Sequence, residues 1–390
     1  MQSNNFSEVK QKTKRIMVVA GEPSGDMHAG CLVENLKKDL LDTHIYGMGG
    51  IEMKKAGVDI LVDSSKLSVV GIFEILKHYP EIKKAFTKLK KSIEANPPDL
   101  LILIDYPEFN LKLAKIAKRK QTKVLFYVSP QVWAWRQGRV KKIKKLVDMM
   151  AVILPFEVDF YRKESIPVRY VGHPLSGKAK PTTSIEISKK EYGLDLNKKT
   201  IGLFPGSRES EIKNHMPLVS KIISYLKKEK INVQFIIPAA PGVDRSSYMR
   251  WIAKDTNYIK LVDDNIYNVI QTCDAIASAS GTVNVQIALM KKPFCVFYKI
   301  SFLTFLIVKN LIKTKSISLV NILFSKNVVK EFIQKEARHQ LIAEELKKLL
   351  YNKGHSAAQE LELEKIKSLI GEKNSTDEVA ILVKEMLLKF

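Results

Sequence analysis

Short apolar runs alternate with longer charged stretches of helical character along most of this 390-residue chain. The runs are rich in Val, Ile and Leu and occupy residues 16–20, 99–105, 123–129, 151–156, 200–206, 233–239, 275–280 and 293–298. Alternation of this kind predicts an α/β protein in which helices cover both faces of parallel sheets.

The alternation stops once and then restarts. Residues 172–200 are rich in Pro, Ser, Thr and Lys, and a new strand and glycine turn follow them. Since the chain also exceeds the size of one growing core, we predict two doubly wound, Rossmann-like domains facing each other across a cleft. They cover residues 1–178 and 190–364, and a helical pattern over about 365–390 is expected to pack back on the first domain.

The charge balance adds a class of partner to this picture. The chain has 64 Lys and Arg against 41 Asp and Glu, a formal charge of +23, which favours nucleic acid, an acidic membrane surface or phosphorylated substrates. Its three cysteines lack CxxC spacing, so they indicate neither a disulfide framework nor a zinc site and fit a reducing cytoplasm. The polar, basic N-terminus does not read as a secretory signal, and no apolar run is long enough to span a membrane.

The first glycine turn, AGEPSGDMHAG at residues 20–30, has an unusual composition. It follows a strand and opens a helix, as phosphate-binding turns do. However, it lacks G-x-G-x-x-G spacing, carries the carboxylates of Glu22 and Asp26, and has Pro23 where a phosphate would need an N–H donor.

A second turn, LFPGSRESEI at residues 203–212, is a clearer phosphate candidate. Gly206 and Ser207 form the turn, and Arg208 opens a helix whose free N–H groups favour an anion. Arg208 is also suited to a bidentate contact with a diphosphate. The alternative is an ordinary turn with an exposed arginine.

A third turn, ASASGTV at residues 277–283, repeats this logic in the same half of the chain. Ser280, Gly281 and Thr282 offer hydroxyls and N–H groups, and Gln286 follows one helical turn later. The two turns together suit one nucleotide diphosphate, while an N-capped helix is the alternative for the third turn alone.

Asp105, in LIDYPEFN, follows a strand of buried type. A partly buried carboxylate at a strand end is a good general base, because burial raises its pKa toward neutral pH. The alternative is that Asp105 caps the next helix.

Two further stretches combine apolar or aromatic residues with cations. Trp133, Trp135 and Arg136 precede a lysine-rich helix, which suits either base stacking or a site near phosphates or an anionic membrane. An apolar patch precedes another lysine-rich helix and suits an acyl chain or a membrane, with core packing as the alternative. Its residues are Val69, Val70, Ile72, Phe73 and Leu76.

These motifs together resemble one family. AGEPSGD, LIDYPEFN, YVSPQVWAWRQGRVKKI, LPFE, YVGHPL, LFPGSRESEI, ASASGTV and SLVNILF are similar, in the same order, to segments of the lipid-A-disaccharide synthases, over residues 16 to about 337. The resemblance implies a glycosyltransferase of the two-Rossmann-domain (GT-B) type that uses no metal or other cofactor.

The resemblance also implies a reaction and a location. Such an enzyme transfers 2,3-diacylglucosamine from UDP-2,3-diacylglucosamine to 2,3-diacylglucosamine 1-phosphate with inversion, giving a β-1,6 disaccharide and UDP in lipopolysaccharide biosynthesis. The expected location is the cytoplasm, peripherally on the anionic surface of the inner membrane. A homodimer is compatible with the sequence.

By the same resemblance, Asp105 matches the family's proposed base, Arg208 its essential arginine and Ser24 its first-turn serine. Asn321 matches the asparagine of the SLPN motif and is expected near the donor, and the apolar patch matches the family's acyl-binding and membrane-facing region. His28 is a second candidate base, and the first turn, including Asp26, is expected to face the acceptor.

The sequence departs from the family pattern at three positions. Gln286 stands where a glutamate grips the ribose, Val320 replaces the proline of SLPN, and Glu108 replaces a frequent aspartate. Altered donor binding at Gln286 therefore stays open.

Two other functions are compatible with parts of the sequence. A non-hydrolysing UDP-sugar 2-epimerase shares the expected fold but needs no acyl-binding patch. A nucleic-acid-binding protein would use the net charge and the Trp-Arg loop, but the sequence contains no nucleic-acid-binding module, so we expect no nucleic-acid partner.

Overall fold

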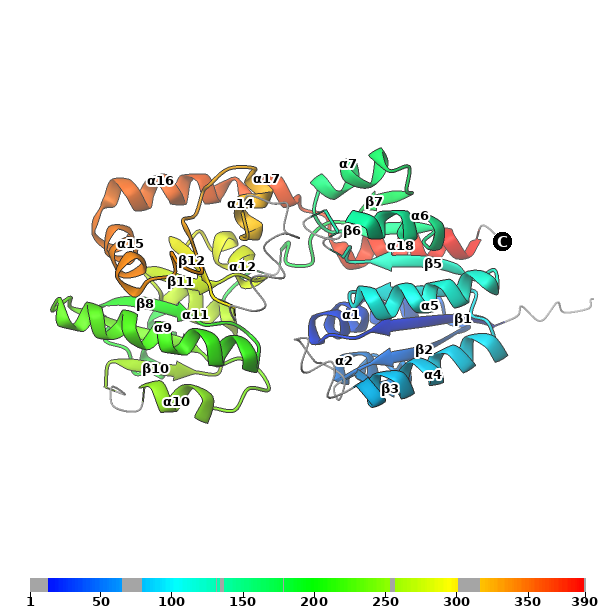
Figure 1. Ribbon diagram of the computed structural model, residues 1–390, viewed down its shortest axis with the longest axis horizontal. Coiled ribbons are helices and arrows are strands. Elements are labelled where there is room, and N and C mark those ends of the chain that lie inside the picture. Colours follow the sequence, from blue (N-terminus) through cyan, green and yellow to red (C-terminus); the bar gives the residue numbers. More distant parts are fainter. Residues whose placement is uncertain are drawn as a thin grey trace, which may run out of the picture. The chain divides into compact units, whose positions relative to one another are not determined.

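The computed structural model describes residues 13–64, 79–130, 132–133, 137–177, 179–252, 257–300 and 316–388. The chain divides into two compact domains. The first domain comprises residues 1–174 and 373–390, and the second comprises residues 175–372. Each has its own parallel sheet with helices on both faces, which confirms the predicted fold class (Figure 1).

The first domain contains a seven-stranded sheet of order β3-β2-β1-β4-β5-β6-β7. Its strands are β1 (Lys14–Ala20), β2 (Thr43–Gly49), β3 (Asp59–Asp63), β4 (Leu100–Ile104), β5 (Lys123–Tyr127), β6 (Met149–Val152) and β7 (Val168–Tyr170). All five residues of β4 are buried, as expected of a central strand that is covered on both faces.

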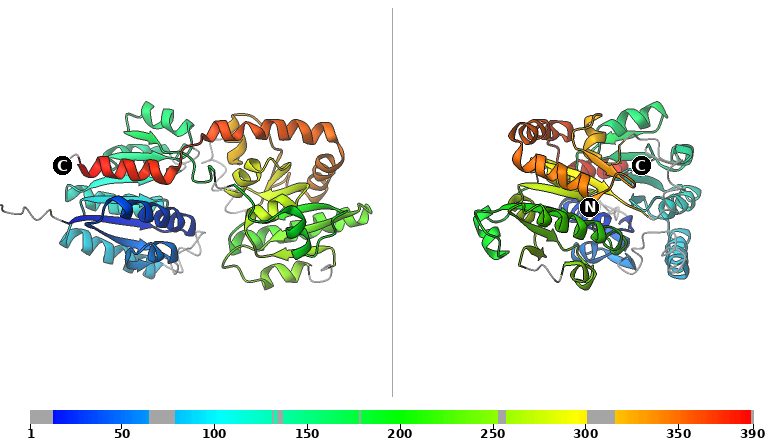
Figure 2. Two further views of the ribbon diagram at one scale, coloured as in Figure 1. Left: turned by 180° about the vertical axis from the view of Figure 1, so that it is seen from behind. Right: turned by 60° about the vertical axis from the view of Figure 1, so that its left-hand side comes forward.

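Two sets of helices cover this sheet. One face carries α4 (Tyr79–Ala95), α5 (Pro107–Arg119), α6 (Val140–Leu146) and α7 (Phe156–Lys163), with the short 3-10 helix η2 (Gln137–Arg139) before α6. The other face carries α1 (Pro23–Asp39), α2 (Ile51–Lys55) and α18 (Ser375–Leu388). The last helix, α18, lies beside α1 although they are far apart in the sequence (Figure 2).

The second domain contains a six-stranded sheet of order β10-β9-β8-β11-β12-β13. Its strands are β8 (Lys199–Phe204), β9 (Val233–Pro238), β10 (Ile259–Val262), β11 (Ala275–Ala279), β12 (Phe294–Tyr298) and β13 (Glu331–Ile333). The helices α9 (Glu209–Lys228), α10 (Ser246–Ile252) and α15 (His339–Tyr351) pack on one face. The other face is covered mainly by α11 (Ile266–Thr272), α12 (Val283–Leu289), α14 (Leu319–Phe324), α16 (Lys353–Glu364) and α17 (Ile366–Ile370), while α8 (Ile185–Glu191) packs on α11.

Residues 365–390 were predicted to pack on the first domain, but they divide between the two domains. Ile366 and Ile370 of α17 are buried in the core of the second domain, and only α18 packs on the first. Gly371, with φ of 63°, separates the two helices, since a glycine adopts this left-handed conformation without strain.

Candidate active site

Each sheet has one switch point, where the order of its strands reverses. The reversal lies between β1 and β4 in the first sheet and between β8 and β11 in the second. Doubly wound sheets bind ligands beyond the carboxyl ends of the strands at such points. The turns that contain Ser24, Asp105, Gly206 and Ser280 follow β1, β4, β8 and β11 respectively. Every predicted turn therefore follows a strand that borders a switch point.

The backbone is strained where β4 and β5 end. Asp105 and Tyr106 have φ of 51° and 42°, and Val128, directly after β5, has φ of 63°. This left-handed region costs a residue other than glycine on the order of 1–3 kcal/mol, and such strain gathers at functional sites. Tyr106, not Asp105, occupies the N-cap position of α5. The strained turn thus presents Asp105 outside the helix.

Asn110 of α5 holds this turn. Its side-chain amide donates hydrogen bonds to the carbonyl oxygens of Ile104 at 3.1 Å and Asp105 at 2.7 Å. Asn110 is fully buried, so these bonds form away from competing water. We interpret Asn110 as a residue that fixes the direction of the Asp105 side chain.

The first glycine turn lies directly against the Asp105 turn. A Cβ atom added to Gly25 would lie 3.4 Å from Oδ2 of Asp105, and one added to Gly21 would lie 2.6 Å from the Tyr106 ring. Ser24, between these glycines, is exposed at the start of α1. The glycines therefore allow a close approach that brings Ser24 and Asp105 into one region.

His28, one turn further along α1, joins a group of buried residues. Its ring centroid lies 6.3 Å from that of Tyr127 at the end of β5. Burial, with a smaller contribution from His28, lowers the pKa of His173 to about 4. Burial raises the pKa of Tyr127 to about 12, and the charge of Asp105 adds a little. His28 thus shares its surroundings with Tyr127 and His173.

Asp26 holds a neighbouring turn, and its expected role at the acceptor side stays a prediction. Its side chain is 6% exposed and accepts hydrogen bonds from the backbone N–H groups of Gly50, Glu52 and Met53, at 2.7, 2.9 and 3.2 Å. Both carboxylate oxygens therefore hold the turn that opens α2.

In the second domain, a glutamate one turn along α9 organises the turn after β8. Gly206 has φ of 129°, and a Cβ atom there would lie 2.5 Å from Oε2 of Glu211. The same oxygen accepts the N–H of Ser207 at 2.9 Å, and Oε1 lies 3.8 Å from the Arg208 guanidinium. Arg208 is exposed and paired with an anion at the start of a 20-residue helix. A carboxylate from the chain itself therefore occupies part of the predicted anion site.

His215 connects this turn to the end of β12. Its Nδ1 lies 2.6 Å from the carbonyl oxygen of Pro205, and its Nε2 lies 3.0 Å from both the N and the O of Lys299. The ring also packs edge-on against Phe297. Burial lowers the pKa of His215, so a neutral imidazole braces the turn at neutral pH.

Asn321 is held by hydrogen bonds within the second domain, and its expected position near the donor stays a prediction. It is 2% exposed, its amide donates to the Val329 carbonyl and to Glu331, and its Oδ1 accepts the N–H groups of Val328 and Val329. All four hydrogen bonds are made within the domain, so Asn321 secures the segment before β13.

The turn after β11 is linked through Ile317 to Glu331 of β13. The Ser280 hydroxyl donates to the carbonyl of Ile317 at 2.9 Å, and Glu331 accepts the Ile317 N–H at 2.9 Å. Gly281 and Thr282 are exposed, and a Cβ atom on Gly281 would meet open space. The turn is therefore anchored at Ser280 and open at the next two residues.

Gln286 is engaged within its own domain. Its amide donates to the Tyr267 hydroxyl at 3.2 Å. Since an amide also accepts hydrogen bonds, its oxygen is suited to a sugar hydroxyl.

Several predicted residues lie outside the part of the chain that the structure describes. They are Val69, Val70, Ile72, Phe73, Leu76, Trp135 and Arg136. Trp133 is described, and its indole N–H donates to Glu157 at 3.0 Å.

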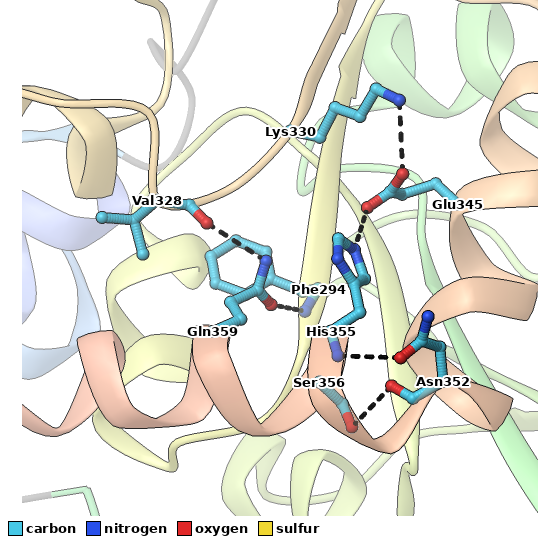
Figure 3. Close-up of polar contacts among 8 residues, drawn as sticks. All are labelled: Phe294, Val328, Lys330, Glu345, Asn352, His355, Ser356 and Gln359. Atoms are coloured by element: carbon cyan, nitrogen blue, oxygen red, sulfur yellow. Dashed lines mark hydrogen bonds and ion pairs between the residues drawn. The ribbon is translucent and has the colours of Figure 1, made fainter.

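The second domain also has cavities of about 530 and 520 Å³ at its two sheet edges, β10 and β13. The β13 cavity is lined in part by Lys330, Glu345 and His355, which form the linked group in Figure 3. Within the described ranges, no three His, Cys, Asp or Glu side chains gather as metal ligands. No described helix is long and apolar enough to cross a bilayer.

Three polar residues were not predicted from the sequence: Asn110, Glu157 and His215. All three are buried, and two of them lie inside the quoted motifs LIDYPEFN and LPFE. A polar residue at an otherwise apolar helix position was the available signal, but its partners depend on the tertiary structure.

The family model and the similar proteins name the same family. Residues 16–384 match the family model for lipid-A-disaccharide synthetase. A lipid-A-disaccharide synthase from Geobacter metallireducens is 44% identical over 376 residues, covering 96% of this chain and 98% of the relative. One from Coxiella burnetii is 39% identical over 374 residues, covering 96% and 99%.

Solved structures share the fold at lower identity. UDP-GlcNAc 2-epimerase from Neisseria meningitidis bound to UDP-GlcNAc has a TM-score of 0.64 at 14% identity, covering 97% of this chain and all of that one. The calicheamicin glycosyltransferase CalG4 has a TM-score of 0.62 at 10% identity, covering 97% and 99%. The fold is thus common to epimerases and glycosyltransferases, whereas the sequence match is specific: this chain belongs to the lipid-A-disaccharide synthetase family.

Proposed function

We propose that this protein transfers 2,3-diacylglucosamine from UDP-2,3-diacylglucosamine to the 6-hydroxyl of 2,3-diacylglucosamine 1-phosphate, with inversion. The products are a β-1,6 disaccharide and UDP. The observation that carries the proposal is the placement of the Asp105 and Arg208 turns beside the switch points of the two sheets. Relatives with 39–44% identity named lipid-A-disaccharide synthase support it.

In the proposed mechanism Asp105 acts as the general base. Its carboxylate takes the proton of the acceptor hydroxyl as that oxygen attacks the anomeric carbon of the donor. The strained turn and Asn110 hold Asp105, so little reorganisation is needed when the acceptor binds. Ser24 is suited to hydrogen-bond the acceptor, and His28 is the alternative base.

The leaving diphosphate is proposed to bind at the start of α9. There, Arg208 supplies a cation and the helix supplies N–H groups aimed at an anion. The donor must then compete with Glu211, which holds the Ser207 N–H and neighbours Arg208. Displacing Glu211 would free both groups for the diphosphate.

The turn at Ser280, Gly281 and Thr282 is proposed to complete the donor site. Gln286 would contact the ribose through its amide oxygen. A neutral amide accepts a weaker hydrogen bond than a carboxylate does, so we expect weaker UDP binding than in a Gln286→Glu variant.

We further propose that the protein binds the anionic surface of the inner membrane from the cytoplasm. Helices α4, α5 and α6 pack on one face of the first sheet and present a row of exposed cations. These cations are Lys83, Lys84, Lys88, Lys90, Lys91, Lys112, Lys115, Arg119, Lys141, Lys142, Lys144 and Lys145. Exposed acidic residues on the same helices are Glu81, Glu94 and Glu108. Such a surface attracts acidic lipids at about 1 kcal/mol per cation.

The test is to incubate the purified protein with both acylated sugars and to follow disaccharide and UDP. Asp105→Asn should lower kcat about 100-fold or more while UDP affinity stays within twofold, because the amide cannot take a proton. Normal turnover by this variant would remove Asp105 from the mechanism. Conversion of the UDP sugar without the acceptor would favour an epimerase instead.

A further inference from the structure

A buried glutamate holds the loop that follows β5. Oε1 of Glu157, in α7, accepts the indole N–H of Trp133 at 3.0 Å, and Oε2 accepts the backbone N–H of Leu154 at 3.1 Å. The Trp133 ring packs edge-on against Phe156, with centroids 4.9 Å apart. Trp133 is therefore held by a polar and an apolar contact at the start of α7.

This arrangement is unusual for a carboxylate, because Glu157 is only 1% exposed. Burying a carboxylate is costly unless hydrogen bonds compensate it. Here the donors include the Trp133 indole, and Ser129 of the same loop shares a 2.7 Å hydrogen bond with Tyr161 of α7. An apolar residue would fill the same space at lower cost, so the two acceptor oxygens are explained by the donors that they hold.

The loop held in this way neighbours the proposed base. Strands β4 and β5 pair in parallel with Ile104 opposite Tyr127, so Asp105 and Val128 leave the sheet side by side. Further along, Arg139 forms an ion pair with Glu108, three residues after Asp105. Trp133 is thus held by α7, and Arg139 by the segment that follows Asp105.

We propose that Glu157 is a positioning residue for the transfer reaction, which it serves by fixing Trp133 through the indole N–H. This inference rests on the proposed function. Glu157 does not touch the reacting atoms. It holds Trp133 in the segment that leaves the sheet beside Asp105, so its loss displaces Trp133 and lowers turnover.

The experiment is a double-mutant cycle with Glu157→Met and Trp133→Phe. Methionine keeps about the volume of Glu157 but removes both acceptor oxygens, and phenylalanine keeps an aromatic ring against Phe156 but removes the N–H donor. Each single variant should lower kcat about 10- to 100-fold, because small displacements near the reacting groups have effects of this size. The double variant should be no slower than the slower single variant, since both changes remove the same contact. UDP affinity, a property of the second domain, should stay within twofold.

Matched controls make the same chemical changes elsewhere. Glu345→Met alters another buried glutamate, 3% exposed, between Lys330 and His355 in the second domain (Figure 3). Trp251→Phe alters a partly exposed tryptophan of the second domain. Both controls should keep kcat within twofold of the wild type.

Two results would overturn the inference while the proposed function stands: an active wild type with normal kcat in Glu157→Met, or multiplicative losses in the double variant. Multiplicative losses would mean that Glu157 and Trp133 act independently. An inactive wild type, in contrast, would refute the proposed function and this role with it. Circular dichroism and UDP affinity identify any variant that fails to fold. In that case Glu157→Asp, which keeps the carboxyl group, serves as the second variant. A kcat restored relative to Glu157→Met supports the role, and an unrestored kcat refutes it.

Discussion

Replacing Glu157 by glutamine should change how the stability of the first domain depends on pH. Burial raises the pKa of Glu157 from an ordinary 4.5 to about 7, although hydrogen bonds from Trp133 and the Leu154 backbone oppose the rise. The buried group that faces it, Tyr161, has a phenol whose pKa is also raised by burial, so it stays neutral in this range. Glu157 is therefore the group of this cluster that titrates near neutral pH.

The sign follows from proton binding. Between pH 4.5 and 7 the folded protein keeps the proton of Glu157 while the unfolded chain releases it, so the free energy of unfolding falls as pH rises. The full stabilisation is present below pH 4.5 and is lost as pH rises through about 7. A pKa rise of this size corresponds to about 3 kcal/mol, of which about 2–3 kcal/mol falls between pH 5 and 8.

The assay is urea unfolding of the wild type and Glu157→Gln at pH 5 and pH 8. A Trp251→Phe background removes the tryptophan of the second domain, so that indole fluorescence reports on the first domain. From pH 5 to pH 8, the free energy of unfolding of the wild type should fall by about 2–3 kcal/mol more than that of Glu157→Gln. Any effect of the amide that does not depend on pH cancels in this comparison. An unchanged difference between the two proteins would refute the raised pKa.

Three other changes test separate parts of the molecule. Arg208→Ala should weaken UDP binding about 10- to 100-fold by calorimetry, the size of a lost charge-assisted hydrogen bond, and unchanged affinity would exclude a diphosphate contact. Asp26→Ala should lower the unfolding free energy by about 1–3 kcal/mol, because three backbone N–H groups lose their acceptor, and a normal Tm would contradict the structural role. Replacing both Lys84 and Lys88 by glutamine should weaken binding to vesicles with acidic lipid about 30-fold, from about 1 kcal/mol per cation, and equal binding would exclude α4 from the membrane surface.

The sequence predicted the central strands well because burial on both faces requires long apolar runs. Every apolar run used in the prediction contains or overlaps a strand. The missed strands are those without such a run. In β2 a glycine is required, since a Cβ on Gly47 would lie 1.9 Å from the Val18 carbonyl oxygen. The edge strands β7 and β13 have only three residues each.

The sequence predicts which turn carries a site residue, but not which partner its side chain contacts. Strand ends and glycines locate the turns at Asp105 and Gly206, since both features are local in sequence. The partner of a polar side chain is not local: Asp26 binds the backbone of residues 50–53, and Asn321 binds that of residues 328–329. A carboxylate or amide in a motif therefore has the same appearance whether it meets a substrate or a neighbouring turn.

Backbone strain distinguishes a residue of the candidate site from a residue that only holds a turn more clearly than residue type does. In the part of the chain that the structure describes, most left-handed residues other than glycine end or follow a helix, where this conformation is a common way to terminate it. These residues are Gln121, Ser165, Lys230, Lys291 and Ser325. Asp105, Tyr106 and Val128 instead follow the neighbouring strands β4 and β5, where no helix needs termination, and Gln334 follows β13. The strain at Asp105 must be offset by other contacts, and the Asn110 amide supplies two of them. A buried polar residue that was not predicted from the sequence is thus one that this strained turn requires.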